Sequence, residues 1–358
     1  MDVSALFNAM PGAIAQGLIW GIMAIGVYIT FRILDIADLS VDGTMCTGAA
    51  VCIMLMQKGY HVAAAMAIAT LAGMLVGLVT GLFHTTMGIP AILAGILTQL
   101  GLWGVNLKIM GKANQPINVD KYDLAVSLRY IKRVAFYKNS IFVVFLFMIV
   151  VIGILYWFFG TELGSSLRAT GCNENMARAQ GINTNFNKVL GLMISNGLVA
   201  FASACLGQYQ GFADINMGKG AIVIGLASVI IGEAIFSRIF KNFALKLLSV
   251  GIGGVIYFIV LQIVIWLGVD TDLLKLFQAL IVAVFLAVPY WKGKHFNKGK
   301  KACGNRREEG GVNTMLELKN IYKTFNAGTV NEKSGIKRTE SDAGGWRFRN
   351  RHRWKRGR

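Results

Sequence analysis

The sequence predicts an all-α polytopic membrane protein with eight to ten transmembrane helices, some of them broken or re-entrant. Two observations support this fold class. Hydrophobic residues make up 55% of the 358 residues and charged residues only 15%, whereas a soluble domain carries about a quarter charged residues. The apolar residues also gather in long runs separated by short polar gaps, which is typical of a chain that crosses a membrane several times.

Nine apolar segments are candidate spans, because a helix needs about 20 apolar residues to cross the core of a bilayer. These segments lie at 12–31, 41–56, 62–83, 89–110, 139–160, 186–208, 219–236, 247–268 and 272–290. Segments 41–56 and 219–236 are short and rich in glycine. Either of them is expected to be a broken or re-entrant helix that is buried in protein. Small residues such as Gly251, Gly253 and Gly254 would let helices approach closely in lipid.

The short basic loops predict the orientation, since cytoplasmic loops of membrane proteins are enriched in Lys and Arg. Residues 161–188, residues 237–246 and the C-terminal tail are basic and can all face the cytoplasm. Nine spans would then place the N-terminus outside. The loop 111–138 disagrees, because it carries six Lys and Arg against two Asp and yet falls on the outer side. Either this loop folds as a small external element, or the count of spans before it is off by one.

A few polar residues lie within or beside the apolar segments, where each is costly unless it faces a partner or a cavity. The candidates for a translocation path are Asp42, Asn196, Gln208, Gln210 and Glu233. The alternative is that these side chains pair across helices or cap helix ends. A helix would place Asp35, Asp38 and Asp42 on one face, whereas Ser40 and Asp42 could equally cap the next helix.

The chain lacks the sequence signatures of an enzyme. It contains no Walker A loop, no G-x-S-x-G elbow and no H-E-x-x-H motif. Its five cysteines form no C-x-x-C pair, so we interpret them as free thiols rather than as a metal site or a disulfide framework. We therefore expect no catalytic residue, no metal site and no cofactor.

The loop "TELGSSLRATGCNENMARAQGIN" at 161–183 is polar, compatible with helix and flanked by two strong spans. Its composition predicts a short amphipathic helix on the cytoplasmic surface that offers a docking face to a soluble partner. The loop resembles the coupling loop of bacterial ABC-importer permeases of the branched-chain amino acid and ribose type, which read like "G-x-x-L-R-A-x-G-x-N-x-x-A-A-x-x-x-G-I". The residues of the predicted ATPase coupling loop are Gly164, Leu167, Arg168, Ala169, Gly171, Asn173, Ala177, Arg178, Gly181 and Ile182.

Two further stretches carry the resemblance, which covers residues 12–290. "GLIWGIMAIGVYITFRILDIADLSVDGTMCTGAAV" is similar to the family's first helix and the "D-L-S-V-G" break that follows it, with Asp42 where many relatives have Gly. "MGIPAILAGILTQLGLWG" is similar to the family's "P-x-x-x-T-L-G" helix, from which Gly95 and Ile96 depart. Within the family, the sequence is most similar to the branch associated with uptake of aromatic amino acids.

The resemblance implies a permease subunit of an ATP-driven importer in the bacterial cell (inner) membrane. A pair of ABC ATPase subunits would dock on residues 164–182, an extracytoplasmic substrate-binding protein would deliver the solute, and a second permease subunit, expected to be an identical copy, would complete the pathway across the lipid bilayer. The solute is expected to be an amino acid, with a sugar or a nucleoside as the alternative. An ATP-independent channel is the alternative from another class, and an intramembrane enzyme would need more than the isolated Glu233.

The C-terminal residues divide into three further parts after a transmembrane permease domain at 1–290. Residues 291–358 carry 19 of the 36 Lys and Arg but only 6 of the 18 Asp and Glu. We expect a basic cytoplasmic extension at 291–314. At 315–333, "MLELKNIYKTFNAGTVNEK" is similar to the first strand of an ABC ATPase, and the preceding "EEGGVN" can be encoded with a ribosome-binding sequence.

Residues 334–358 are predicted to be an out-of-frame, disordered basic tail. Back-translated and read one nucleotide later, they can encode a string ending in "VIGGNGA", which matches the opening of a Walker A loop. The neighbouring ATPase gene would thus begin at Met315 and shift frame near residue 333. No nucleic-acid partner is then expected. A true basic tail that binds anionic lipid or nucleic acid is the alternative.

Overall fold

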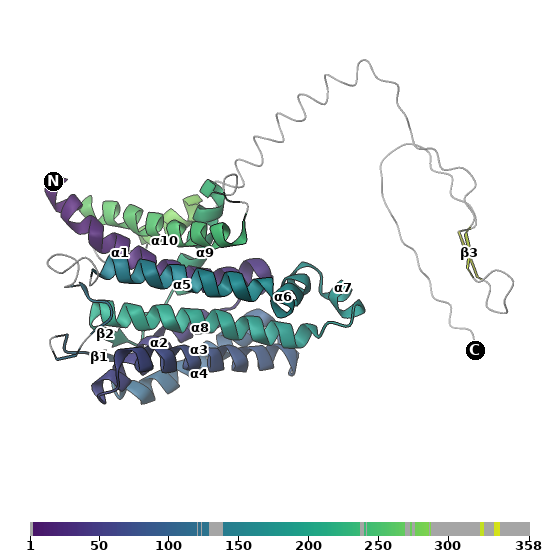
Figure 1. The fold of residues 1–358 in the computed structure, drawn as a ribbon, viewed down its shortest axis with the longest axis horizontal. Coiled ribbons are helices and arrows are strands. Elements are labelled where there is room, and N and C mark those ends of the chain that lie inside the picture. Colours follow the sequence, from purple (N-terminus) through teal and green to yellow (C-terminus); the bar gives the residue numbers. More distant parts are fainter. Residues whose placement is uncertain are drawn as a thin grey trace, which may run out of the picture. The chain divides into compact units, whose positions relative to one another are not determined.

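The computed structural model describes residues 3–119, 121–122, 124–128, 139–236, 240, 242–268, 273, 276–285, 287, 323–325 and 333–336. The chain forms two compact units, residues 1–293 and residues 294–358, which are described separately. The first unit is a bundle of helices (Figure 1). Its elements in chain order are α1 (Val3–Tyr28), the π-helix η1 (Ile29–Ile33), α2 (Ser40–Gln57), α3 (Val62–Thr85), α4 (Ala91–Met110), β1 (Asn114–Pro116), α5 (Ser140–Gly160), α6 (Glu162–Cys172), α7 (Glu174–Ala179), α8 (Thr184–Gln210), β2 (Phe212–Asp214), α9 (Ala221–Phe236) and α10 (Phe243–Trp266).

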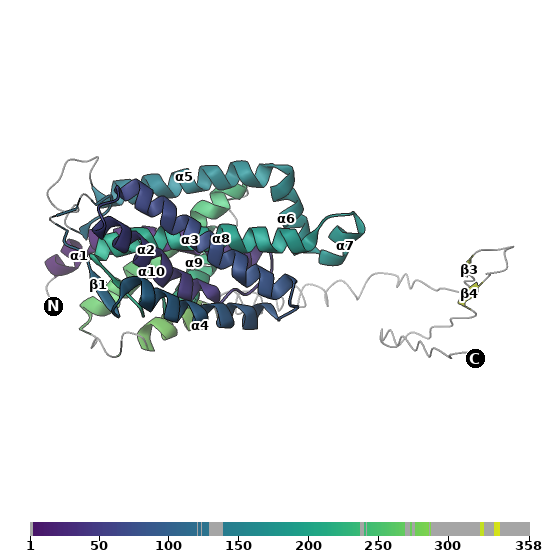
Figure 2. The same cartoon turned by 90° about the horizontal axis from the view of Figure 1, so that it is seen from below.

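The long helices lie side by side, so the bundle has two ends (Figures 1 and 2). One end carries the N-terminus and the pairing of β1 with β2, and the other end carries α6 and α7. Since α5 runs toward α6 and α8 runs back from α7 to β2, these two helices are antiparallel. The basic loop 161–188 therefore lies at the end opposite to the loop 111–138.

Helices in this bundle approach one another closely at glycines. A Cβ atom added to Gly77 of α3 would lie 2.3 Å from the carbonyl oxygen of Leu192 in α8, and one added to Gly73 would lie 2.5 Å from that of Asn196. Close backbone approach of this kind lets helices associate in lipid, where the hydrophobic effect gives them little reason to do so. The packing of α3 on α8 is thus set by glycines four residues apart.

The predicted fold class, an all-α polytopic membrane protein, is confirmed. Within the described residues, six helices are long and apolar enough to cross a membrane. Helices α2, α9 and Leu276–Phe285 occupy the other three predicted segments and are shorter or less apolar. The two glycine-rich segments, 41–56 and 219–236, are thus the short helices α2 and α9.

The loop 111–138 forms a small element at the end of the bundle that carries the N-terminus. β1 pairs antiparallel with β2, so that Gln115 lies opposite Ala213. The side chain of Gln57, at the end of α2, donates a 2.8 Å hydrogen bond to the carbonyl oxygen of Pro116. The described residues of this loop thus form a small element, as in the first alternative; its place outside the membrane stays a prediction, and residues 129–138 lie outside the described part.

The second unit is described at only two strands. β3 (Lys323–Phe325) pairs antiparallel with β4 (Lys333–Ile336). The proposed ATPase strand "LELKNIYKTF" includes β3 at its end, and the rest of that strand lies outside the described residues. The basic tail beyond Ile336 also lies outside them.

Candidate functional site

The predicted coupling loop folds as two short helices rather than the single amphipathic helix that its composition predicts. The break falls at Asn173, whose backbone is extended with φ −160° and ψ 101°. Its side-chain oxygen accepts the backbone N–H of Met176 at 3.1 Å and so caps the first turn of α7. An asparagine that caps a new helix ends the one before it, which separates α6 from α7.

Several motif residues hold α6 against the transmembrane helices. A Cβ atom on Gly164 would lie 2.4 Å from the carbonyl oxygen of Phe158, so only glycine allows the sharp corner between α5 and α6. Leu167 is fully buried. A Cβ atom on Gly171 would lie 1.7 Å from the carbonyl oxygen of Ile33, so the backbone of α6 touches η1 directly.

Other motif residues shape the turn after α7. The N–H of Ile182 donates to the carbonyl oxygen of Ala177 at 3.1 Å, and the N–H of Gly181 donates to that of Arg178 at 3.0 Å. Gly181 has φ +83°. This is the Schellman arrangement, in which a glycine in the left-handed region ends a helix. The matching glycine and isoleucine of the motif therefore terminate α7, while Ala177 is buried beneath it.

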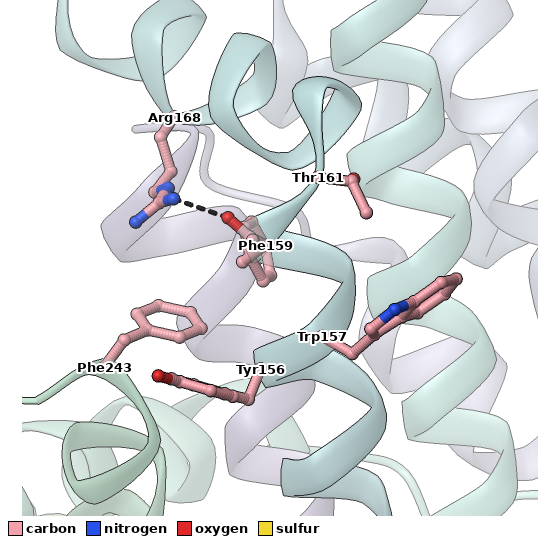
Figure 3. Close-up of a pocket in the computed structure, with 7 residues that line it drawn as sticks. Tyr156, Trp157, Phe159, Thr161, Arg168 and Phe243 are labelled. Atoms are coloured by element: carbon pink, nitrogen blue, oxygen red, sulfur yellow. Dashed lines mark hydrogen bonds between the residues drawn. The ribbon is translucent and has the colours of Figure 1, made fainter.

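Arg168 binds the end of α5. Its guanidinium donates a 2.5 Å hydrogen bond to the carbonyl oxygen of Phe159, and it lies 6.0 Å and 5.7 Å from the ring centroids of Phe159 and Phe243. These three side chains line a cavity of about 530 Å³ together with Tyr156 and Trp157. Figure 3 shows the five side chains. A cation near the last carbonyl groups of a helix is stabilised by the negative end of the helix dipole. Arg168 thus fastens α6 to α5 and α10, while Ala169 beside it is half-buried.

Glu174 fastens α7 to the start of α8. Its carboxylate accepts from Lys188 Nζ at 2.8 Å and from Arg178 at 2.5 Å. The hydrogen bond from Lys188, with the charges of Lys188 and Arg178, lowers the pKa of Glu174 below its ordinary value despite partial burial. α6 is joined to α8 as well, because Asn187 donates to the Thr170 hydroxyl at 2.9 Å. The two short helices therefore form one unit with the transmembrane helices.

Three apolar side chains that the motif does not include are exposed on α6, α7 and the start of α8. Leu163, Met176 and Phe186 are 50%, 62% and 53% exposed. Of the residues named in the motif, most point inward or form turns. Most of the motif residues therefore hold the loop in place, and sequence reasoning did not single out these three exposed apolar side chains.

Asp42 joins α2 to α9. Its carboxylate accepts the backbone N–H groups of Gly220 at 2.9 Å and Ile222 at 3.0 Å, so it caps α9 from another helix. A Cβ atom on Gly218 would lie 1.9 Å from the carbonyl oxygen of Asp42. The chain that precedes α9 therefore packs directly against the backbone at Asp42. The cap that Asp42 forms is on α9, not on α2.

Asn196 lies in a buried network of side chains from the α1–α2 turn, α2 and α8. Its amide donates to Asp38 Oδ2 at 2.7 Å, and its side-chain oxygen accepts from the Thr44 hydroxyl at 2.6 Å. The Ser40 hydroxyl donates to Asp38 Oδ1 at 2.6 Å. The expectation that Asp35, Asp38 and Asp42 share one face of a helix is wrong, since residues 35–38 are not helical. The chain leaves the helical conformation after η1, and Asp38 instead forms a hydrogen bond with Asn196 of α8.

The other three candidates for a translocation path lie elsewhere. Gln208 is fully buried and accepts the backbone N–H of Ala125 at 3.0 Å. Gln210 is exposed at the end of α8 beside β2. Glu233 forms an ion pair with Arg32 of η1, with 3.1 Å between Glu233 Oε1 and Arg32 Nε. The structure therefore places the five candidates in separate groups, and four of them cap or join elements; their part in a translocation path stays a prediction.

A bundle of membrane-spanning helices with a structured polar loop at one end is the architecture expected of a transport permease. The chain belongs to the family described as the permease component of the branched-chain amino acid transport system, whose profile matches residues 10–289. It is therefore a multi-pass protein of the bacterial cell membrane, and its family implies an ATPase and a substrate-binding protein as partners in general terms. The family and its relatives are transport permeases, not enzymes.

Named relatives support this assignment. The chain is 36% identical over 280 residues to the tyrosine transport system permease protein of Clostridioides difficile (strain R20291), which covers 78% of this chain and 91% of the relative. It is 27% identical over 250 residues to the inner membrane ABC transporter permease protein YjfF of Escherichia coli (strain K12), covering 70% and 72% of the two chains. An uncharacterized protein of Rickettsia prowazekii (strain Madrid E) is 35% identical over 283 residues, which are 78% of this chain and 97% of the relative. No solved structure matches the chain.

Proposed function

We propose that this chain is the membrane subunit of an ATP-driven importer for an amino acid, and that α6 and α7 are the surface on which its ATPase subunits dock. The observation that carries the proposal is the structured loop 161–183, which is fastened to α5, α8 and η1 and leaves Leu163 and Met176 exposed, with Phe186 exposed just after it at the start of α8. A rigid element with an exposed apolar face can both bind a soluble partner and transmit a push from it. The basic residues of this loop support its position on the cytoplasmic side.

An amino acid is the proposed solute because a relative that covers most of the chain is named a tyrosine transport permease. A sugar or nucleoside permease is the alternative within the class. The test is uptake into proteoliposomes that contain this chain, its ATPase subunit and its substrate-binding protein. ATP-dependent uptake of radiolabelled tyrosine or another amino acid supports the proposal. Uptake of a labelled sugar or nucleoside but of no amino acid would contradict the proposed solute. Uptake without ATP would contradict the proposed ATP-driven mechanism.

The docking surface is tested by one substitution at two places. Met176→Asp puts a charge into the free face of α7, whereas Met87→Asp puts the same charge on a methionine that is 65% exposed outside the loop. We expect Met176→Asp to weaken binding of the ATPase subunit at least about tenfold, as for loss of an apolar interface anchor. Met87→Asp should bind like the wild type. Equal binding by both variants would contradict the docking role of α7.

A second permease subunit is part of the proposal, and we infer that it is an identical copy. The stoichiometry of the purified complex tests this inference. Two copies of this chain with two ATPase subunits would support it, and one copy with a different permease would contradict it.

The C-terminal residues have a separate proposed origin. We propose that the codons of residues 315–333 are the beginning of a neighbouring ATPase gene. Residues 334–358 would then be the translation, in the wrong frame, of the DNA that encodes the start of its Walker A region. The purified chain alone should therefore hydrolyse no ATP. Sequencing of the DNA beyond codon 290 tests the origin: a shifted frame that continues into a complete ATPase supports it, and the lack of any such frame contradicts it.

A further inference from the structure

The turn from α1 to α2 has an unusual backbone. η1 is a π-helix, in which the N–H of Leu34 donates to the carbonyl oxygen of Ile29 at 3.1 Å. Short π-helical turns of this kind frequently occur at functional sites. Asp35 follows with φ 57°, the one positive φ of a non-glycine residue in the described part of the chain. This left-handed conformation is uncommon for residues other than glycine, and aspartate is one of the few that adopt it readily in a turn.

One side of η1 touches the coupling loop. The close approach of Gly171 to Ile33 brings the last turn of α6 into backbone contact with the end of η1, since a Cβ atom there would also lie 2.9 Å from Leu34 Cα. A Cβ atom on Gly191 of α8 would lie 2.2 Å from Leu34 Cδ1 and 3.4 Å from Leu167 Cδ1. η1 and α6 thus share a packing site on α8, and a displacement of α6 must displace the end of η1.

The other side of η1 is joined to α9. Arg32 Nε lies 3.1 Å from Glu233 Oε1, and the two side chains are 59% and 33% exposed. An ion pair at this degree of exposure contributes little net stability and can break and re-form. The opposite end of α9 is held by Asp42 of α2. α9 is therefore bonded to η1 near its C-terminal end, through Glu233, and to α2 at its N-terminal end, through Asp42.

We propose that Gly171, Arg32 and Glu233 are positioning residues for transport, through which a displacement of α6 reaches α9. The proposal rests on the proposed function, because it needs α6 to be pushed by the ATPase. In this proposal, η1 and the left-handed turn at Asp35 are the element that changes between two arrangements. The Arg32–Glu233 pair is made in one arrangement and broken in the other, and Asp38 anchors the far end of the turn through Asn196. Chains of packed side chains and ion pairs carry coupling when they join such an element.

The experiment measures ATP hydrolysis and uptake in the same proteoliposomes, made with the full chain, its ATPase subunit and its substrate-binding protein. The probe is a mixture of the twenty radiolabelled amino acids. Arg32→Glu and Glu233→Arg are each expected to lower the uptake per ATP hydrolysed about two- to fivefold or more, because each puts two like charges in place of an exposed ion pair. The double variant, with the two charges exchanged, should restore the wild-type ratio. A merely structural pair would lower the amount of folded protein and leave this ratio unchanged.

A second pair of variants tests the contact between α6 and η1. Gly171→Ala adds a methyl group at the contact with Ile33, whereas Gly153→Ala adds one to a position on α5 with no atom within 4 Å. We expect Gly171→Ala to copurify with the ATPase subunit and to lose most uptake per ATP, and Gly153→Ala to match the wild type. A wild-type ratio in all single variants, or a double variant that does not restore it, would overturn the inference alone. A wild-type complex without ATP-dependent uptake would overturn the proposed function as well.

Discussion

The contact of Asp42 with α9 makes a quantitative prediction about stability. Asp42→Ala removes the acceptor of two backbone N–H groups, those of Gly220 and Ile222, at 2.9 and 3.0 Å. Each partly buried donor that loses its partner costs about 1–2 kcal/mol, so the substitution should lower the free energy of unfolding by about 2–4 kcal/mol. Asp42→Asn keeps one acceptor oxygen and should cost about half as much.

The assay can use cysteines that the chain already has. Cys46, Cys52 and Cys205 are free and buried, so a dye that reacts with thiols reports their exposure during heating. At about 2 °C per kcal/mol, Asp42→Ala should lower the Tm by about 4–8 °C and Asp42→Asn by a smaller amount.

A matched control separates the cap from a general effect of lost charge. Glu162→Gln removes an exposed carboxylate in the first turn of α6 and should change the Tm by less than about 2 °C. If Asp42→Ala unfolds at the wild-type temperature, or if it shifts the Tm no more than Glu162→Gln does, the cap does not hold the start of α9 and the reasoning is refuted.

Three further predictions concern other contacts of the bundle. Glu174→Gln should lower the Tm at pH 7, and this difference from the wild type should vanish as the pH falls below 4.5. The reason is that a carboxylate with a lowered pKa stabilises the fold above its ordinary pKa and loses that effect as it becomes protonated. Tm values between pH 3.5 and 7 check this, and a difference that grows in acid would contradict it. Gly77→Ala should cost about 1–3 kcal/mol because its methyl group would meet the backbone of α8, whereas Gly153→Ala should be neutral; equal Tm values for the two would contradict the close approach. Asn196→Ala leaves the buried Asp38 carboxyl group without one donor and should cost about 1–3 kcal/mol. The yield of folded protein and its Tm check this, and an unchanged Tm would mean that the network contributes nothing.

The helices were predictable from the sequence because each apolar run that crosses a bilayer must satisfy its own backbone hydrogen bonds. All nine predicted segments coincide with helices in the described part of the chain, including the short α2 and α9. The opposite location of the loops 111–138 and 161–188 followed from the number of helices between them. These features depend on local composition and chain order alone.

The functional contacts were less predictable because their partners are distant in sequence. Helical spacing suggested one face for Asp35, Asp38 and Asp42, but Asp38 is bonded to Asn196, 158 residues away, and Asp42 to Gly220, 178 residues away. Tertiary hydrogen bonds override the local helical period there. Similarly, the motif identified Gly171 as a match, and only the structure shows that this glycine admits the carbonyl group of Ile33.

ATP-dependent uptake in proteoliposomes tests the central claim most directly. Vesicles would contain this chain with its substrate-binding protein, once with and once without the ATPase subunit, and would be supplied with labelled tyrosine and ATP. A permease driven through α6 and α7 predicts uptake against a gradient only when the ATPase subunit is present, and loss of that uptake in Met176→Asp. Flux that is equal with and without the ATPase subunit would contradict the account and would identify a channel instead.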